Sequence, residues 1–134
     1  MRVYLVEDAP AIREALIQRI EDDPRFSVSG YADTAQGAIT DLGQRLPDVL
    51  ILDLHLKQGT GYDVLAYLHR AEAPADLKTF VLTNYATSSH RQRAMMLGAD
   101  GFFDKSMQFD EMLDSLRILA DERGPKNPGG PLQS

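Results

Sequence analysis

The chain has 134 residues, enough for one compact domain, and it carries 14 basic against 20 acidic residues for a formal net charge of −6. Its 43% hydrophobic and 25% charged residues are ordinary for a globular protein, and no apolar run approaches the roughly 18 residues of a membrane span. The absence of cysteine excludes disulfides and thiolate metal sites, and the acidic balance without a basic stripe disfavours direct nucleic-acid binding. Residues 1–8 reach an acidic pair too soon for a signal-peptide apolar segment, so cytoplasm is the expected location.

Apolar runs alternate with amphipathic stretches, a pattern typical of a parallel sheet covered by helices. A strand is expected over residues 3–6, followed by a helix with Pro10 in its first turn. One face of that helix is predicted to carry the apolar residues Ile12, Leu16 and Ile20. A second, less hydrophobic strand over 26–32 is expected nearer a sheet edge, with Asp33 capping the helix that follows.

The second helix shows the same apolar spacing, at Ala35, Ala38, Ile39, Leu42 and Leu46. An unbroken apolar run over 49–52 predicts a third strand that is buried on both faces. A loop at 59–61 leads to a third helix, whose apolar residues are Val64, Leu65 and Leu68. Residues 79–82 predict a fourth strand.

A fourth helix is expected over about 88–97, ended by Gly98, and a short fifth strand over 101–103. The last helix has apolar residues at helical spacing, namely Phe109, Met112, Leu113 and Leu116. These five βα units predict an α/β fold, a doubly wound five-stranded parallel sheet with five helices. We expect one domain over residues 1–123 and a flexible Gly/Pro-rich tail over 124–134.

Polar side chains follow four of the five expected strands. In chain order they are Glu7 and Asp8, then Asp53, then Thr83, then Asp104 and Lys105. Because ligands of an open parallel sheet gather beyond the carboxyl ends of its strands, these side chains are expected to lie at one rim.

Carboxylates that converge on one rim repel one another, by roughly 4 kcal/mol for a pair about 4 Å apart at an effective dielectric near 20. A hard divalent cation with oxygen ligands, Mg²⁺ or Mn²⁺, would relieve that repulsion. Phosphoryl transfer needs a nucleophile, a metal and donors for the phosphoryl oxygens. Asp53 can supply the carboxylate nucleophile, Thr83 a hydroxyl donor and Lys105 a cation, so one reaction explains the whole set.

Each of these residues also fits a structural role when it is taken alone. An Asp such as Asp53 after a strand is often a cap or turn residue, and the pair Glu7 and Asp8 suits a helix start. Thr83 alone suits a turn, and Lys105 alone suits a solvated surface. The joint pattern, with the required type at each strand end in order, favours phosphoryl transfer.

Together these motifs resemble the receiver domains of response regulators in two-component signal transduction, of the single-domain, chemotaxis-regulator-like kind with flavodoxin-like topology. The resemblance runs from about Arg2 to about Arg123. The residues that carry it are Glu7 and Asp8 after Val6, Asp53 after Leu52, Gly61 eight residues later, Leu82 with Thr83, the segment 97–101, and Asp104 with Lys105.

The resemblance implies that a histidine kinase or a phosphotransfer protein phosphorylates Asp53. The chain would then be a phosphoacceptor that takes part in its own phosphorylation and dephosphorylation, and not a conventional enzyme. Mg²⁺ would bind Asp8, Asp53 and the backbone carbonyl of His55, with Glu7 acting largely through water.

The resemblance also implies a switch. Lys105 would pair with the phosphoryl group, Thr83 would move toward it, and Phe102 would follow inward. The face of the fourth helix, fifth strand and fifth helix would then bind a downstream protein, or a second copy in a phosphorylation-dependent homodimer. In receivers, the positions of His55 and Tyr85 flank the path of the hydrolytic water, so we expect these residues to set the lifetime of the phosphorylated state. The alternative is that both are exposed loop residues.

Three positions depart from the usual family pattern. Ser106 stands where a cis proline is common, and because a cis bond before serine costs about 3–4 kcal/mol, we expect a trans bond or a strained loop. Lys57 also stands at a common proline position, and Asn84 replaces a smaller residue beside the phosphoryl site. We expect these substitutions to leave the phosphorylation chemistry intact and to affect the details of the switch.

Other functions compete with this interpretation. The main alternative is the receiver part of a longer DNA-binding regulator cut before its output domain, although a stand-alone receiver is preferred for the chain as given. A haloacid-dehalogenase-type hydrolase would need a second Asp where His55 stands. A flavodoxin-like carrier needs a phosphate loop where Glu7 and Asp8 would repel an anion, and no dinucleotide or Walker motif is present.

Overall fold

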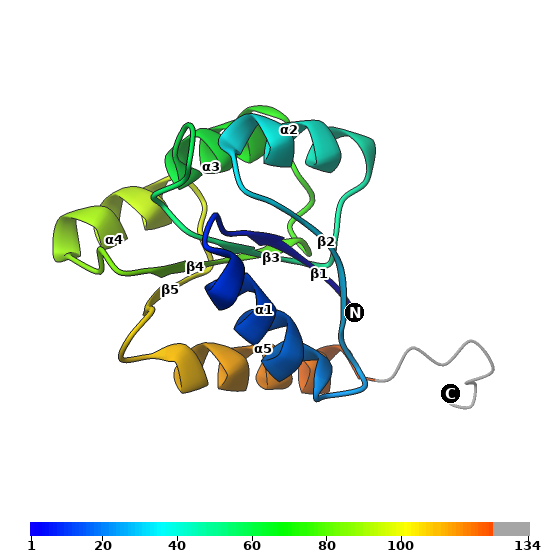
Figure 1. The fold of residues 1–134 in the computed structure, drawn as a ribbon. Coiled ribbons are helices and arrows are strands. Elements are labelled where there is room, and N and C mark those ends of the chain that lie inside the picture. The colour runs from blue at the N-terminus through cyan, green and yellow to red at the C-terminus, as the bar shows by residue number, and fades with distance from the viewer. Residues whose placement is uncertain (125–134) are drawn as a thin grey trace.

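The structure is a computed structural model that describes residues 1–124, which form five strands and five helices (Figure 1). The strands are β1 (Arg2–Val6), β2 (Ser27–Ala32), β3 (Val49–Leu52), β4 (Lys78–Thr83) and β5 (Gly101–Asp104). The helices are α1 (Pro10–Glu21), α2 (Ala35–Gln44), α3 (Gly61–Arg70), α4 (Ser88–Met96) and α5 (Phe109–Arg123). The tail predicted over 124–134 lies outside the described residues except for Gly124, which follows α5 with a φ of 68°.

The five strands form one parallel sheet in the order β2-β1-β3-β4-β5. Helices α1 and α5 cover one face, and α2, α3 and α4 cover the other (Figure 1). This confirms the predicted doubly wound α/β fold and the edge position of β2. Within residues 1–124, each helix is too short or too polar to cross a lipid bilayer.

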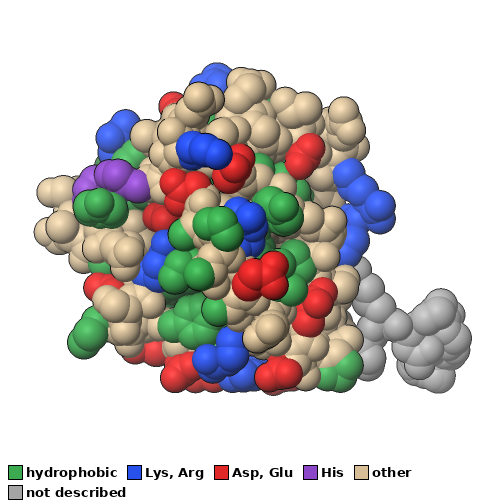
Figure 2. Space-filling view, in the orientation of Figure 1, with side chains coloured by type: hydrophobic (Ala, Val, Ile, Leu, Met, Phe, Trp, Pro, Cys, Tyr) green, Lys and Arg blue, Asp and Glu red, His purple; other side chains and the backbone are tan. Residues whose placement is uncertain are grey.

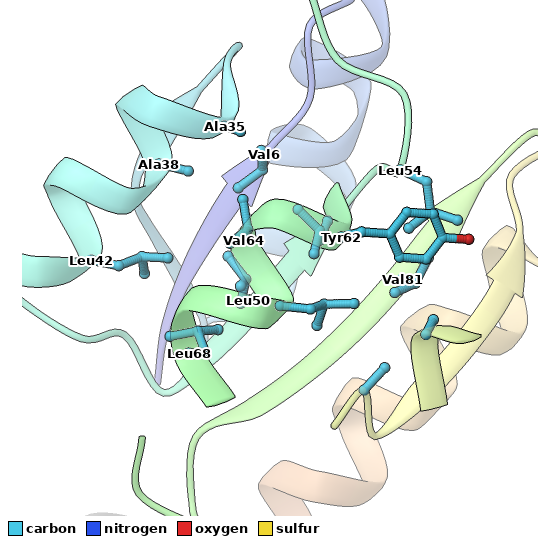
Figure 3. Close-up of a cluster of buried hydrophobic side chains, with 14 of the residues drawn as sticks. Val6, Ala35, Ala38, Leu42, Leu50, Leu54, Tyr62, Val64, Leu68 and Val81 are labelled. Carbon is cyan, nitrogen blue, oxygen red and sulfur yellow. The ribbon is translucent and has the colours of Figure 1, made fainter. Parts of the chain in front are cut away.

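The core has two layers, one on each side of the sheet, and β3 contributes to both. Leu50 and Leu52 pack with α2 and α3 in the layer shown in Figure 3, whereas Val49 and Ile51 pack with α1 and α5. Successive side chains of a strand point to opposite faces, so a strand with helices on both sides must be apolar at every position. This explains the unbroken apolar run of β3 and confirms its predicted burial on both faces.

The cap predicted for α2 is wrong by one residue. Thr34, and not Asp33, has the extended backbone of an N-cap, and its hydroxyl oxygen accepts a hydrogen bond from the Gly37 N–H at 3.0 Å. Asp33 instead forms an ion pair with Lys57, with 3.6 Å between Oδ2 and Nζ.

Two apolar residues do not contribute to the helix faces predicted for them. Leu46 lies beyond the end of α2, because a residue that precedes a proline, here Pro47, disfavours helical backbone. Ile12 belongs to α1 but is 37% exposed, whereas Leu16 and Ile20 are buried. The face that α1 packs on the sheet therefore begins at Leu16.

Candidate functional site

The carboxyl ends of the central strands meet at one rim, as the parallel topology requires. Val6 and Leu52 are register partners, and the Asp53 N–H donates to the Val6 carbonyl at 3.0 Å just past that pair. At the other end of the rim, the Lys105 N–H donates to the Thr83 carbonyl at 2.8 Å. Backbone pairing between the strands therefore fixes the backbone positions of the predicted functional residues.

Three of the predicted carboxylates form a cluster. Glu7, Asp8 and Asp53 each offer an oxygen, and these oxygens all lie within 4.8 Å of one another. Glu7 is only 3% exposed and Asp53 only 7%, while Asp8 is partly exposed. A set of closely spaced carboxylate oxygens suits a hard divalent cation such as Mg²⁺.

The Lys105 ammonium bridges two of these carboxylates. Its Nζ lies 2.8 Å from Glu7 Oε1 and 2.7 Å from Asp53 Oδ2, and the lysine side chain is 9% exposed. Burial alone would lower the pKa of Lys105, but the hydrogen bonds to Asp53 and Glu7 outweigh burial and raise the pKa above its ordinary value. The ammonium thus stays charged and offsets part of the carboxylate repulsion.

Backbone contacts fix the orientation of the cluster. Glu7 Oε2 accepts from the Ala9 N–H at 3.1 Å, and Asp53 Oδ1 accepts from the His55 N–H at 3.3 Å. The guanidinium of Arg13 donates to the Glu7 carbonyl at 3.0 Å, which ties α1 to the β1–α1 loop. Both carboxylates are therefore held by the loops that follow their strands.

Gly61 allows α3 to begin directly against the strand end that carries Asp53. Its N–H donates to the Leu54 carbonyl at 3.0 Å. A Cβ at position 61 would lie 2.4 Å from the Asp53 carbonyl oxygen, closer than atoms can approach. Only glycine fits this contact, which explains its place eight residues after Asp53.

The predicted switch and lifetime residues lie on β4, on β5 and in the loops after β3 and β4. Thr83 is fully buried, and its hydroxyl oxygen accepts from the Tyr85 N–H at 3.1 Å. Phe102 is 5% exposed, and its carbonyl accepts from Arg91 Nη1 at 3.2 Å. The rings of His55 and Tyr85 stack with centroids 3.8 Å apart. Their effect on the lifetime of the phosphorylated state stays a prediction.

Sequence reasoning did not identify the residues that connect this ring pair to α3 and α4. The Tyr62 hydroxyl of α3 is hydrogen-bonded to Nδ1 of His90 in α4. The His90 ring lies 6.4 Å from the rings of both His55 and Tyr85. Tyr62 and His90 are 28 residues apart, and no spacing pattern in the sequence links them.

The three positions that depart from the family pattern are accommodated locally. No peptide bond among residues 1–124 is cis, so the Lys105–Ser106 bond is trans, one of the two expected outcomes. Lys57 is exposed in its ion pair with Asp33, and Asn84 is exposed.

Comparisons with known proteins identify the family of the chain. A family model described as "Response regulator receiver domain" matches residues 3–117. The chain is 32% identical over 120 residues to a nitrate/nitrite response regulator protein homolog of Haemophilus influenzae, covering 90% of this chain and 57% of that protein. It is 34% identical over 120 residues to the nitrate/nitrite response regulator protein NarP of Escherichia coli, covering 89% and 54%.

Solved structures show the same fold. The receiver domain of HemR from Leptospira biflexa superposes with a TM-score of 0.76 at 30% identity, covering 94% of this chain and 98% of that one. A LuxR-family two-component response regulator from Aurantimonas gives a TM-score of 0.80 at 26% identity, with 90% and 85% covered. The chain spans little more than half the length of the two relatives named above. The family model and the matching fold show that the chain belongs to the family of response regulator receiver domains.

Proposed function

We propose that Asp53 accepts a phosphoryl group from a histidine kinase or a phosphotransfer protein in a Mg²⁺-dependent reaction. One observation carries this proposal: a buried Asp53 carboxylate shares its oxygen cluster with Glu7 and Asp8 and a bridging ammonium with Glu7. A carboxylate nucleophile, acidic metal ligands and a fixed cation are the groups that phosphoryl transfer to aspartate requires.

The donor set supports a site for Mg²⁺, which Mn²⁺ could also occupy. Asp8, Asp53 and the His55 carbonyl would hold the cation, with Glu7 acting largely through water. When bound, the cation would neutralise negative charge on the phosphoryl oxygens. The Asp53 carboxylate already accepts a hydrogen bond from the His55 N–H, which holds the loop after β3 close to the proposed cation site.

The protein's own groups supply the remaining chemistry. An Asp53 oxygen attacks phosphorus, the bond from phosphorus to the donor nitrogen breaks, and the leaving imidazole takes up a proton. Lys105 turns from its carboxylate partners to the phosphoryl oxygens and balances their charge. The Thr83 oxygen already accepts from Tyr85, so its hydroxyl proton is available for a phosphoryl oxygen.

Phosphorylation would act on the face formed by α4, β5 and α5. Thr83 moves toward the phosphoryl group, and Phe102, which is already buried, repacks into the space that Thr83 leaves. The side of α4 that faces β5 carries Arg91, which donates to the Phe102 carbonyl, and Met95 lies one turn further on the same side and is 39% exposed. An exposed apolar side chain there supports a downstream protein or a second copy as the partner of this face. On the face seen in Figure 2, acidic and basic side chains are interspersed and form no basic stripe, which supports a protein partner over nucleic acid.

We propose residues 1–123 as the receiver domain. The second candidate function is the receiver part of a longer DNA-binding regulator. One observation favours it: the chain covers 56% of a protein named DNA-binding transcriptional activator DevR/DosR of Mycobacterium tuberculosis, at 27% identity. Reading the gene beyond codon 134 would distinguish the two, because only the longer protein continues into an output domain.

The decisive experiment is phosphorylation by acetyl phosphate, with and without Mg²⁺, read by intact mass. Wild type is expected to gain one phosphoryl group only with Mg²⁺, and Asp53→Ala is expected to gain none. Asp114→Ala is the matched control, because Asp114 is an exposed carboxylate in a surface ion pair with Arg117, and this variant should react like wild type.

Two outcomes would overturn the proposal. One is an adduct that forms equally in Asp53→Ala, since the phosphoryl group would then lie elsewhere. The other is no adduct on wild type under conditions in which calorimetry shows that Mg²⁺ binds.

A further inference from the structure

Four residues between β5 and α5, at 105–108, decide where the Lys105 ammonium can lie. The backbone of Lys105 is held by one hydrogen bond to Thr83, and its side chain then has to reach both Glu7 and Asp53. Ser106 follows with no ring to restrict the backbone. Some other contact must therefore hold this loop.

The side chain of Asp104 makes that contact. Its Oδ1 accepts three hydrogen bonds from the loop: the Ser106 hydroxyl at 2.8 Å, the Ser106 N–H at 2.9 Å and the Met107 N–H at 3.1 Å. Gln108 closes the loop from the other end. Its Oε1 accepts from the Asp104 N–H at 2.9 Å, and its own N–H donates to the Asp104 carbonyl at 2.8 Å.

We infer that Asp104, braced by Gln108, is a positioning residue that holds the 105–108 loop so that the Lys105 ammonium lies between Glu7 and Asp53. Because the function of Lys105 is to meet the phosphoryl group, this inference rests on the proposed function. A brace matters here because a side chain that is already in place loses little freedom when the phosphoryl group arrives.

Two other roles for Asp104 fit the structure less well. Among residues 1–124, the acidic cluster that could hold a metal consists of Glu7, Asp8 and Asp53, and Asp104 is not part of it. Asp104 does not cap α5 either, since the N-cap residue of that helix is Gln108. The Ser106 hydroxyl and the loop N–H groups lower the pKa of Asp104, so its carboxylate stays charged and keeps these bonds near neutral pH.

The test compares Asp104→Ala with Asp104→Asn. All three loop bonds go to the same oxygen, Oδ1, which an asparagine amide can also present as an acceptor. Asp110→Ala is the matched control, because Asp110 is an aspartate of α5 whose exposed ion pair with Arg19 does not touch the loop.

The first readout does not depend on phosphorylation. A buried, hydrogen-bonded ammonium exchanges slowly with water and gives a ¹H–¹⁵N cross-peak, which is assigned to Lys105 by its loss in Lys105→Arg. We expect this cross-peak in wild type, Asp104→Asn and Asp110→Ala, and its loss in Asp104→Ala. The second readout is the phosphorylation rate at saturating acetyl phosphate, which should fall about three- to tenfold in Asp104→Ala alone.

A merely structural role predicts a different result, in which Asp104→Ala lowers thermal stability and Mg²⁺ affinity together. Positioning predicts a lost cross-peak together with Mg²⁺ binding at least as tight as in wild type, because an ammonium that no longer lies between Glu7 and Asp53 opposes the cation less. If Asp104→Ala does not fold, Gln108→Ala removes the opposite end of the brace and should attenuate the same cross-peak.

A folded Asp104→Ala with the wild-type cross-peak would overturn the inference, whether or not Asp53 is phosphorylated. Failure of wild type to accept a phosphoryl group would overturn the proposed function instead, and the cross-peak would still decide whether Asp104 positions Lys105.

Discussion

At the scale of single residues, the Lys105 ammonium contacts carboxylates that are proposed to hold a divalent cation. It is hydrogen-bonded to Asp53 and Glu7, two of the three members of the acidic cluster. It therefore stabilises the metal-free protein and at the same time opposes metal binding, because like charges repel at short range. Metal affinity and phosphoryl transfer should respond to Lys105 in opposite directions.

Lys105→Met tests this opposition. Loss of the ammonium should tighten Mg²⁺ binding by about tenfold, equivalent to ~1.4 kcal/mol, because the cation no longer competes with a fixed charge. The same variant should accept phosphate more slowly from acetyl phosphate. Calorimetry measures the affinity, and Lys57→Met is the control, since it removes the same charge from an exposed side chain near the rim. Weaker Mg²⁺ binding in Lys105→Met than in Lys57→Met would contradict the prediction.

The stacked rings of His55 and Tyr85 lead to a second prediction at this scale. Tyr85→Ala should speed hydrolysis of the phosphorylated protein by about two- to tenfold, because water gains access to the phosphoryl group. Stacking couples the two rings, so the double alanine variant should differ from the sum of the single variants by about 0.5–1.5 kcal/mol of activation free energy. Loss of the phosphoryl mass over time gives the rates.

The control for this cycle is His69→Ala, which removes an exposed ring from the last turn of α3. An unchanged hydrolysis rate in the double variant would leave His55 and Tyr85 as loop residues with no effect on lifetime.

At the scale of elements, the parts of the fold that packing dictates could be predicted from the sequence. A strand such as β3 must be apolar throughout when helices cover both faces, and the sequence shows this directly. Boundaries were predicted less well. Neighbouring Asp33 and Thr34 are both good cap residues, and backbone geometry that the sequence does not display selects Thr34.

The functional site likewise contains residues that the sequence predicts and contacts that it does not. Glu7, Asp53 and Lys105 could be predicted because parallel strands bring their ends to one rim whatever the loops do. The brace from Asp104 could not, since its partners depend on how one short loop folds. The contact between His90 and Tyr62 depends on the packing of two helices and left no pattern either.

Gly61→Ala tests the close approach of α3 to the strand end. A Cβ 2.4 Å from the Asp53 carbonyl oxygen forces the helix or the strand to move, which should destabilise the protein by about 1–3 kcal/mol. Urea unfolding measures the change. Gly43→Ala is the control, because Gly43 is exposed within α2 and a Cβ there would meet only the end of a side chain, the Tyr67 hydroxyl at 3.2 Å. The stability of this variant should stay within about 1 kcal/mol of wild type. Equal stabilities of the two variants would contradict the contact.

At the scale of the whole molecule, the two helices that flank β5 in the chain, α4 and α5, are anchored unequally. Helix α5 buries five residues, among them Met112 and Leu116, whereas the shorter α4 buries Ala94. The N-terminus of α4 is held by its Thr87 cap and by the His90 contact to α3. Because α4 buries so little surface, a change at the nearby Thr83 can shift this helix with only a small loss of packing free energy.

Hydrogen exchange with beryllofluoride, a phosphoryl mimic, tests this expectation over the whole chain. With Mg²⁺, amide exchange in α4 and β5 should change by about three- to tenfold, because the mimic biases the Thr83 and Phe102 arrangement on that side. Exchange in α2 should stay the same, since α2 packs on the far part of the sheet beside α3. Asp53→Ala should abolish the change, and sedimentation of the same samples shows whether the mimic also promotes a dimer. Equal changes in α2 and α4 would mean that the mimic tightens the entire domain, and the α4–β5–α5 face would then have no special part in the switch.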